Sequence, residues 1–265
     1  MHERERWQAI LGLVRQRKVM PVRDLAAAVS ASSATLRRDL TKLAAMGQLR
    51  RVHGGVEAVD PDHRPLLATR AFDISRTLNA ERKRAIAKAA VALCKDGEAI
   101  VINGGTTTFQ MVEFLADRRL HILTNSFPIA EALVHSSENR IVLPGGEVYR
   151  EQSLILSPFD GDSIQHYTAS KMFMSAMSVG PLGLIEGDPL IARAEAKLLS
   201  RAADLIVLVD SSKFEPRGSM AVAPLSRIRT LITDDEAPQG ALDMLREAAV
   251  EVIVVPTESK LLSVA

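Results

Sequence analysis

The chain has 265 residues, 47% of them hydrophobic and 25% charged, which suits a globular protein with more than one core. No apolar run reaches the roughly 18 residues of a membrane span, and we expect no secretory signal at the charged N-terminus. The single cysteine, Cys94, excludes a disulfide within the chain. We therefore expect a cytoplasmic protein with a buried, unreactive thiol.

The net charge of +1 conceals an asymmetry along the chain. Residues 1–58 hold eleven Lys or Arg against five Asp or Glu, whereas residues 59–265 hold 22 against 27. A basic head on an acidic body indicates that only the head meets a polyanion. A basic face that is merely solvated is the alternative, and charge alone does not decide between the two.

Two helices are predicted at the start of the head. Apolar residues in the segment 3–16 recur at the spacing of one helix face, at Trp7, Ile10, Leu11 and Val14. Pro21 then opens a second, short helix at a position where its missing N–H costs nothing. In this second helix Leu25 and Val29 are turned inward.

A third helix follows, with Ser32 as its N-cap and Gly47 just past its end. Its inward stripe consists of Leu36, Leu40 and Leu43. At about 100° per residue, Thr35, Arg38, Thr41 and Lys42 lie opposite this stripe, and Arg37 lies to one side. A helix, a short helix, a tight turn and a cationic helix predict a helix-turn-helix whose third helix reads DNA.

A small β-hairpin is predicted after this helix. Leu49 and Val52 alternate with basic residues, two glycines turn the chain, and an apolar run brings it back. Such a hairpin is a wing, whose arginines would touch the DNA backbone or minor groove. A helical hairpin with a solvated face is the alternative for the head as a whole.

The stretch SASSATLRRDLTKLAAMGQLRRVHGG resembles the DNA-binding head of the DeoR/GlpR family of bacterial transcriptional repressors. The resemblance rests on Ser-x-x-Thr-x-Arg-Arg-Asp-Leu in the third helix and on Arg-x-His-Gly-Gly in the wing. It implies that Arg37 and Arg38 contact DNA. The candidate DNA-binding residues are Ser32, Ser33, Thr35, Arg37, Arg38, Lys42, Arg50, Arg51 and His53.

The pattern predicts three parts: a winged helix-turn-helix over 1–58, an extended linker over 59–79 and an effector-binding and oligomerisation domain over 80–265. Within the last part, strand-like apolar runs lie at 99–102, 121–123, 140–143, 172–174, 205–209, 230–232 and 251–255. Helical patterns follow the linker from about Ala80 and lie at 108–116, 128–135, 192–203 and 240–249. This alternation predicts an α/β fold with a mostly parallel sheet covered on both faces.

In such a sheet, ligands bind beyond the carboxyl ends of the strands. Four polar or glycine-rich segments follow predicted strands: NGGTTT at 103–108, TNS at 124–126, PGGE at 144–147 and DSSK at 210–213. Glycines and a helix start favour an anion, and Lys213 adds a full charge. The natural guest is a phosphate on a small polyhydroxy molecule, with Asn125, Asp210 and Glu195 available for its hydroxyls. A turn that needs glycine is the alternative for each segment alone.

The family resemblance extends over nearly the whole chain, and the family's effector domain is similar to ribose-5-phosphate isomerase. LILSPFDGDSIQHYTASKMFMSA and LVDSSKFEPRGSM resemble the ascorbate-utilisation repressor branch, which implies a phosphorylated ascorbate as effector. Asn103 stands where many family members have an aspartate, and the missing charge suits an anionic ligand. The candidate effector-binding residues are Asn103, Gly104, Gly105, Thr106, Thr107, Thr108, Thr124, Asn125, Gly145, Gly146, Glu195, Lys197, Asp210 and Lys213.

Two functions stay open. In the first, a bacterial repressor of a carbohydrate-utilisation operon is released from double-stranded operator DNA by a phosphorylated sugar or sugar acid. It acts as a dimer or tetramer, is associated with the nucleoid through its DNA, and has no membrane partner. In the second, a sugar-phosphate isomerase-like enzyme carries a fused head, with Asp210, Glu195 and Lys213 as acid or base.

The basic head favours the repressor, because a free enzyme has no need of it. On this interpretation we expect no catalytic residues and no cofactor. We also expect no metal, because the six histidines are scattered without ligand spacing.

Overall fold

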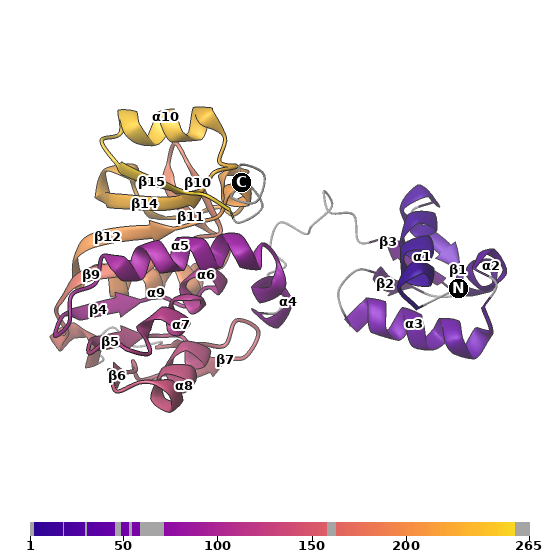
Figure 1. Ribbon diagram of the computed structural model, residues 1–265, viewed down its shortest axis with the longest axis horizontal. Helices are drawn as coiled ribbons and strands as arrows, with labels where there is room; N and C mark the ends of the chain where they lie inside the picture. The colour runs from indigo at the N-terminus through magenta and orange to yellow at the C-terminus, as the bar shows by residue number, and fades with distance from the viewer. Residues whose placement is uncertain are drawn as a thin grey trace, which may run out of the picture. The chain divides into compact units, whose positions relative to one another are not determined.

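The computed structural model describes residues 3–17, 19–29, 31–45, 49–52, 55–58, 72–157 and 163–257. It divides into two compact units, residues 1–68 and 69–265 (Figure 1). Each unit has its own hydrophobic core. Every helix in these ranges is too short or too polar to cross a membrane.

The first unit combines helices with a small sheet. Its elements are α1 (Glu3–Arg17), β1 (Val19–Pro21), α2 (Val22–Ala28), α3 (Ser33–Ala45), β2 (Leu49–Val52) and β3 (Gly55–Ala58). The strands form an antiparallel sheet in the order β1-β3-β2. The inward residues predicted for the helices are confirmed: Ile10, Val14, Leu25, Val29, Leu36, Leu40 and Leu43 are at most 3% exposed.

Strand β1 corrects one prediction. Pro21 ends this strand instead of opening a helix, and α2 begins at the following residue. Proline is tolerated there because β1 is an edge strand, paired only with β3. Opposite Pro21 stands Gly55, where an added Cβ would come within 2.6 Å of the Met20 carbonyl oxygen, so the strands meet only because this residue is glycine.

The second unit is an α/β domain. Its helices are α4 (Phe72–Thr77), α5 (Ala80–Ala92), α6 (Thr106–Phe109), α7 (Met111–Leu115), α8 (Phe127–Ser136), α9 (Pro189–Leu199) and α10 (Gln239–Glu247), with 3-10 turns η1 (Ser163–His166), η2 (Ser211–Phe214) and η3 (Leu225–Arg227). Its strands are β4 (Ala99–Ile102), β5 (His121–Thr124), β6 (Arg140–Val142), β7 (Glu147–Tyr149), β8 (Leu154–Leu156), β9 (Ala169–Met174), β10 (Ser178–Gly180), β11 (Gly183–Glu186), β12 (Ala202–Leu208), β13 (Met220–Ala223), β14 (Ile228–Asp234) and β15 (Glu251–Val255).

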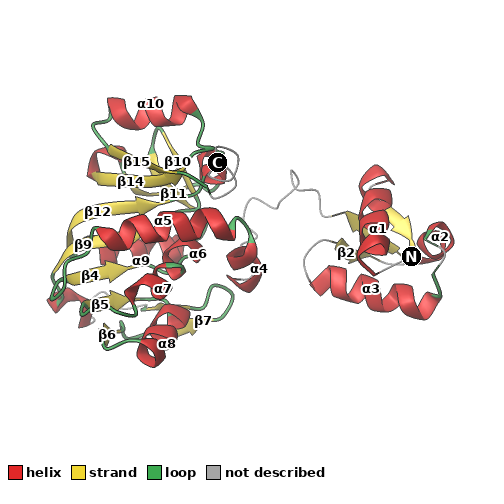
Figure 2. Ribbon diagram, in the orientation of Figure 1, coloured by secondary structure: helices red, strands yellow, loops and turns green. Residues whose placement is uncertain are grey.

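A seven-stranded parallel sheet runs through this unit in the order β15-β14-β12-β9-β4-β5-β6 (Figure 2). Alternate residues of a strand enter opposite cores, as in β4, where Ile100 and Ile102 join one cluster and Val101 the other. Helices α5, α7 and α8 cover the first face, and α9 and α10 the second. The predicted fold class, a parallel sheet covered on both faces, is confirmed.

Three predictions about the second unit need correction. The segment expected to be an extended linker ends in a helix, α4. The helix expected over 192–203 ends at Leu199, because Ala202 pairs with Ala169 of β9 and starts β12. The hairpin β7-β8 and the antiparallel sheet β10-β11-β13 were not expected. Their strands have three or four residues, too few for a periodic signal.

Cys94 behaves as expected of a small buried hydrophobe. It packs among the residues of α5 and the neighbouring strands at 4% exposure. Burial, and then the nearby charge of Glu98, raise the pKa of its thiol to about 12. The thiol is therefore protonated at neutral pH and is not a nucleophile.

Candidate DNA-binding surface and effector site

Helix α3 presents a polar and cationic face opposite its buried leucines. Arg37 and Arg38 are exposed on this face. Ser32 caps the helix, because its Oγ accepts a hydrogen bond from the Thr35 N–H at 3.2 Å and lies 2.9 Å from the Thr35 hydroxyl. A capped helix with two exposed arginines in its second turn can present them to base edges and phosphates.

The aspartate that follows these arginines points the other way. Asp39 is 2% exposed; its Oδ2 accepts from Arg6 Nε at 2.6 Å and its Oδ1 from Trp7 Nε1 at 3.0 Å. Burial alone would raise the pKa of Asp39, but the hydrogen bonds from Arg6 and Trp7 and the charge of Arg6 outweigh burial and lower it. Asp39 thus fastens α3 to α1 while Arg37 and Arg38 stay outside.

The remaining DNA-binding candidates fall at several places. The Lys42 ammonium is exposed and lies 5.7 Å from the centre of the Trp7 ring, a cation–π distance. Ser33 is the first residue of α3, and Arg50 and Arg51 lie in β2, opposite β3. His53 lies outside the described residues.

In the second unit, the chain order of the sheet reverses between β4 and β9. Ligands bind at such a switch point in open α/β sheets. Asn103 directly follows β4 there and joins the two strand ends. Its Oδ1 accepts from the Ser175 N–H at 3.0 Å, and its Nδ2 donates to the Ser175 carbonyl at 3.0 Å and to Glu195 Oε1 at 2.7 Å. Asn103 therefore links the end of β4 to the end of β9 and to α9.

The glycines after Asn103 allow close packing. A Cβ on Gly104 would meet the Leu154 side chain at 1.9 Å, and one on Gly105 would meet the Ser175 hydroxyl at 1.8 Å. The Gly104 N–H donates to Asn125 Oδ1 at 2.9 Å. Because this donor fixes the amide oxygen, the Nδ2 of Asn125 must face the other way. That nitrogen is buried without a hydrogen-bond partner among the described residues.

Three of the candidate threonines, Thr106, Thr107 and Thr108, follow β4, and the fourth, Thr124, ends β5. Thr108 donates to the carbonyl oxygens of Asn103 and Gly105 at 2.9 and 3.0 Å, and Thr124 Oγ1 accepts from the Ser126 N–H at 3.1 Å. Thr107 is buried, and Thr106 begins α6. Helix α6 has only four residues, so it contributes little of the positive helix end that was expected.

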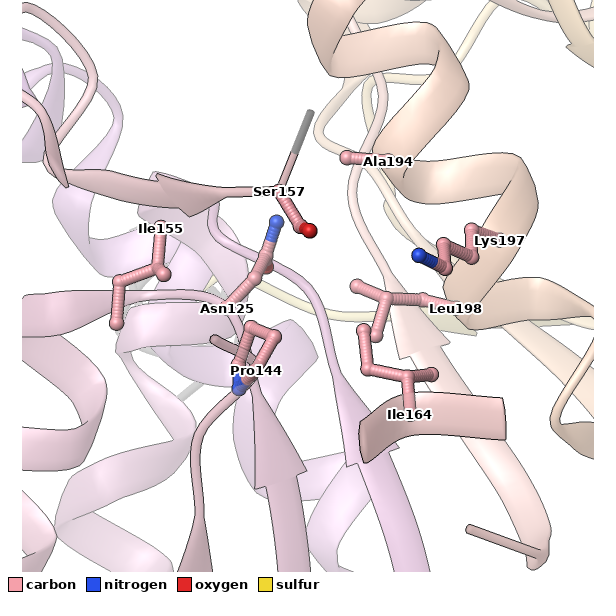
Figure 3. Close-up of a pocket in the computed structure, with 8 residues that line it drawn as sticks. All are labelled: Asn125, Pro144, Ile155, Ser157, Ile164, Ala194, Lys197 and Leu198. Atoms are coloured by element: carbon pink, nitrogen blue, oxygen red, sulfur yellow. The ribbon is translucent and has the colours of Figure 1, made fainter. Parts of the chain in front are cut away.

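A pocket opens beside Asn125, between the strand ends and α9. Its lining residues are Asn125, Pro144, Ile155, Ser157, Ile164, Ala194, Lys197 and Leu198. In Figure 3 the Asn125 nitrogen lies beside the Ser157 hydroxyl on one side of the pocket, and the Lys197 nitrogen points toward this space from α9 on the other side. The pocket is partly open to solvent and holds about 10 Å³, about the space of one water molecule.

The third expected loop contributes to this pocket only through Pro144. Gly145 and Gly146 are exposed and are not among the lining residues. Gly146 has φ 151°, and a Cβ there would lie 2.4 Å from the Leu156 carbonyl oxygen. The conformation of the turn therefore explains why residue 146 is glycine, without a role in ligand binding.

The loop after β12 is arranged around buried carboxylates. Asp210 Oδ1 accepts from Asn79 Nδ2 at 3.2 Å, from the Ser212 N–H at 3.0 Å and from the Ser212 hydroxyl. Lys213 belongs to the same turn, and its charge acts on Glu186. Burial raises the pKa of Glu186 more than its backbone hydrogen bonds and Lys213 lower it.

Glu195 lies under the switch point at 3% exposure. Burial first, and then the charge of Glu186, raise its pKa well above the ordinary value, against the hydrogen bond from Asn103. Its Oε2 has no hydrogen-bond partner in the described part of the chain. The structure thus brings Glu195 together with Asn103, and Lys197 together with Asn125, whereas Lys213 does not line the pocket.

Sequence reasoning missed several residues of this region. Ser175 follows β9 at the switch point, and the segment after that strand could have been examined like the others. Ile155, Ser157 and Ile164 line the pocket from β8, from the residue after it and from η1. No periodic or motif signal marks these three, because the pocket joins them only through the fold.

Two family models match the chain. The DeoR-like helix-turn-helix domain matches residues 6–62, and the DeoR C terminal sensor domain matches residues 78–235. Curated relatives include the HTH-type transcriptional regulator UlaR of Shigella dysenteriae serotype 1 and that of Escherichia coli O1:K1 / APEC. Each is 34% identical over 255 residues, which cover 96% of this chain and all of the relative.

The chain belongs to the DeoR family of transcriptional regulators.

This membership confirms the family resemblance, including the likeness to the ascorbate-utilisation repressor branch. It also decides between the two functions left open by the sequence. The matched relatives are transcriptional regulators with a DNA-binding helix-turn-helix, so the chain is a DNA-binding regulator and not an enzyme.

Two solved structures are among those similar to this chain. Ribose 5-phosphate isomerase A from Methanocaldococcus jannaschii is 24% identical, with 51% of this chain and 55% of that chain covered and a TM-score of 0.39. Translation initiation factor eIF-2B from Pyrococcus horikoshii OT3 is 15% identical, with 86% of each chain covered and a TM-score of 0.41.

Proposed function

We propose that this regulator represses a carbohydrate-utilisation operon and leaves its operator when a phosphorylated sugar or sugar acid occupies the pocket between β8 and α9. The observation that carries the proposal is the buried Asn125 Nδ2, a donor without a partner among the described residues, which lines the same pocket as Lys197. An unmet buried donor costs about 1–3 kcal/mol, and an anionic oxygen placed between the two nitrogens would recover it.

The size of the pocket supports a conformational effect of the ligand. A sugar phosphate does not fit a cavity of about 10 Å³, so the walls must separate when it binds. The wall formed by Ala194, Lys197 and Leu198 belongs to α9, whose Glu195 is bonded to Asn103 at the switch point. The ligand would therefore bind an open arrangement better than the closed one, which is the condition for shifting a population.

The DNA-binding unit supplies the other half of the function. Arg37 and Arg38 contact the operator from α3, with the wing of β2 and β3 on the flanking backbone. Operators of helix-turn-helix proteins are paired half-sites about 34–36 Å apart, so the active form is a dimer or tetramer. The resemblance to the ascorbate-utilisation branch makes a phosphorylated ascorbate the first effector to test.

A binding experiment with matched variants tests the pocket. Asn125→Asp keeps the oxygen that accepts from Gly104 and replaces the donor facing the pocket with an acceptor. Lys197→Gln removes the charge opposite, and Lys88→Gln removes an exposed lysine of α5 as a control.

We expect phosphorylated ascorbate or ribose 5-phosphate to raise the thermal midpoint of the wild type and of Lys88→Gln. Asn125→Asp and Lys197→Gln should each weaken binding by about tenfold or more, the worth of one charge-assisted hydrogen bond. Undiminished binding by both pocket variants would refute the site. A wild type that binds no phosphorylated sugar or sugar acid would refute the function.

A further inference from the structure

The start of the sensor unit is bonded to loops that follow strands at the same edge of the parallel sheet as the effector pocket. Helix α4 is the first described element after the DNA-binding unit, and residues 78 and 79 connect it to α5. Asn79 occupies this junction with φ 52° and ψ 34°, the left-handed conformation that asparagine tolerates better than most residues. Its side chain donates to Asp210 at 3.2 Å, so the junction is tied to the loop after β12.

Arg82, one turn into α5, makes a second connection to the same loop. Its Nη1 donates to the Ser211 hydroxyl at 2.9 Å and lies 4.0 Å from Asp234 Oδ1, and its Nη2 lies 2.6 Å from Glu236. Asp234 is fully buried and accepts from the Ser211 N–H at 2.7 Å. A movement of the Ser211 turn therefore changes the partners of Arg82.

Helix α4 also touches the loop after β4. The Arg76 guanidinium lies 5.2 Å from the centre of the Phe109 ring, in α6, which begins within the NGGTTT segment. The buried Lys83 ammonium donates to the Ser75 carbonyl at 2.7 Å and so holds α4 against α5. A rearrangement of the loop after β4 or of the loop after β12 would therefore alter the contacts of α4 or of its junction with α5. Helix α4 is the first described element after the DNA-binding unit in the sequence.

We propose that Asn79 and Arg82 couple the effector site to the DNA-binding unit, by tying the α4–α5 junction to the Asp210–Ser211 turn. This inference rests on the proposed effector function. A ligand that separates the pocket walls moves α9, and both Glu195 of α9 and Lys213 of the turn interact with Glu186. The turn then shifts with α9, the bonds to Asn79 and Arg82 change, and α4 is held differently against α5. Allosteric coupling needs such an element with two arrangements, whose balance each site shifts.

The test separates coupling from binding. Asn79→Gly removes the side-chain bond and keeps a residue that accepts the left-handed backbone, and Arg82→Gln removes the charge. Arg84→Ala is the control, because Arg84 lies on the same helix but pairs with Glu113 and lies over the Phe114 ring, both in α7. Each full-length variant is assayed for phosphorylated ascorbate binding, and for affinity to an operator duplex selected by the wild type from a random pool, with and without that ligand.

We expect the ligand to weaken operator binding by the wild type and by Arg84→Ala about 5- to 150-fold, the usual range of allosteric coupling. For Asn79→Gly and Arg82→Gln this ratio should fall to about twofold or less, while the dissociation constant for the ligand changes by less than about threefold. A merely structural role would weaken both affinities and leave their ratio unchanged.

Two variants that bind the ligand and release DNA like the wild type would overturn the coupling alone. A wild type that binds no ligand would overturn the proposed function and this inference with it. Hydrogen exchange of the wild type gives a check without variants: the ligand should alter protection at residues 72–82, and unchanged protection there would contradict the coupling.

Discussion

Asp39→Asn removes the charge that fastens α3 to α1 in the DNA-binding unit. The wild-type carboxylate accepts from Arg6 at 2.6 Å and from Trp7 at 3.0 Å at a buried position. Asparagine can keep one of these bonds, but it turns an N–H toward the other donor. The loss of one charge-assisted, buried hydrogen bond costs about 1.5–3 kcal/mol, so we expect the free energy of unfolding of this unit to fall by about 2 kcal/mol.

The assay uses the single tryptophan of the chain, Trp7, whose fluorescence reports on the DNA-binding unit within the full-length protein. A unit this small has a urea m-value of about 1 kcal/mol/M, so the midpoint of the Trp7 transition should fall by about 2 M. Glu113→Gln, at a half-exposed position of the other unit, should leave that midpoint in place. A midpoint for Asp39→Asn within about 0.3 M of the wild type would refute the reasoning.

The pH dependence gives an independent check on the same bond. The folded pKa of Asp39 lies below its ordinary value, so the ionised carboxylate stabilises the folded state. This contribution is present above the unfolded pKa of about 4 and is lost as the pH falls through the folded pKa. The difference between wild type and Asp39→Asn should therefore be full at pH 7 and shrink in acid; a difference that grows in acid would contradict the assignment.

Three further outcomes follow from the two units. Arg38→Ala should weaken operator binding and reduce the salt slope of the affinity by about one, which gel-shift titrations at several salt concentrations measure; an unchanged affinity would exclude the contact. Lys213 lies outside the pocket, but its charge acts on Glu186, which interacts with Glu195 of α9. Lys213→Ala should therefore bind DNA normally but need more effector for release, and a release curve that overlays the wild type counts against its role. Removal of residues 1–58 should leave a folded body that binds ligand, and an unfolded product by circular dichroism would move the domain boundary.

Much of the fold could be predicted because its elements carry periodic signals. The leucines of α3 recur at helical spacing and all face the core. The strands of the parallel sheet are nearly continuous apolar runs, since both faces are covered, and β4 shows this in sending successive residues to different cores. Strand β1 was missed because its three residues end in proline, and its pairing with β3, which no sequence pattern shows, makes it a strand.

The site was predictable as an edge of the sheet but not as a set of contacts. The sequence places Asn103, Asn125 and Asp210 after strands, and the structure finds them there. The sequence could not show that the Asn103 amide is hydrogen-bonded to Ser175 and Glu195. Nor could it show that Asn125 Nδ2, beside the pocket, has no hydrogen-bond partner among the described residues. Such a distinction depends on which neighbours the fold brings within hydrogen-bond distance, and that is a property of tertiary structure.

The central claim is that a charged metabolite, bound unchanged, releases this regulator from DNA. Fluorescence anisotropy of a labelled operator duplex bound to the full-length chain, titrated with phosphorylated ascorbate while the compound is followed by phosphorus NMR, tests it most directly. We expect the anisotropy of the operator to fall as the compound is added, and the phosphorus signal of the compound to stay unaltered. Steady anisotropy at saturating compound, or the appearance of a product, would contradict it.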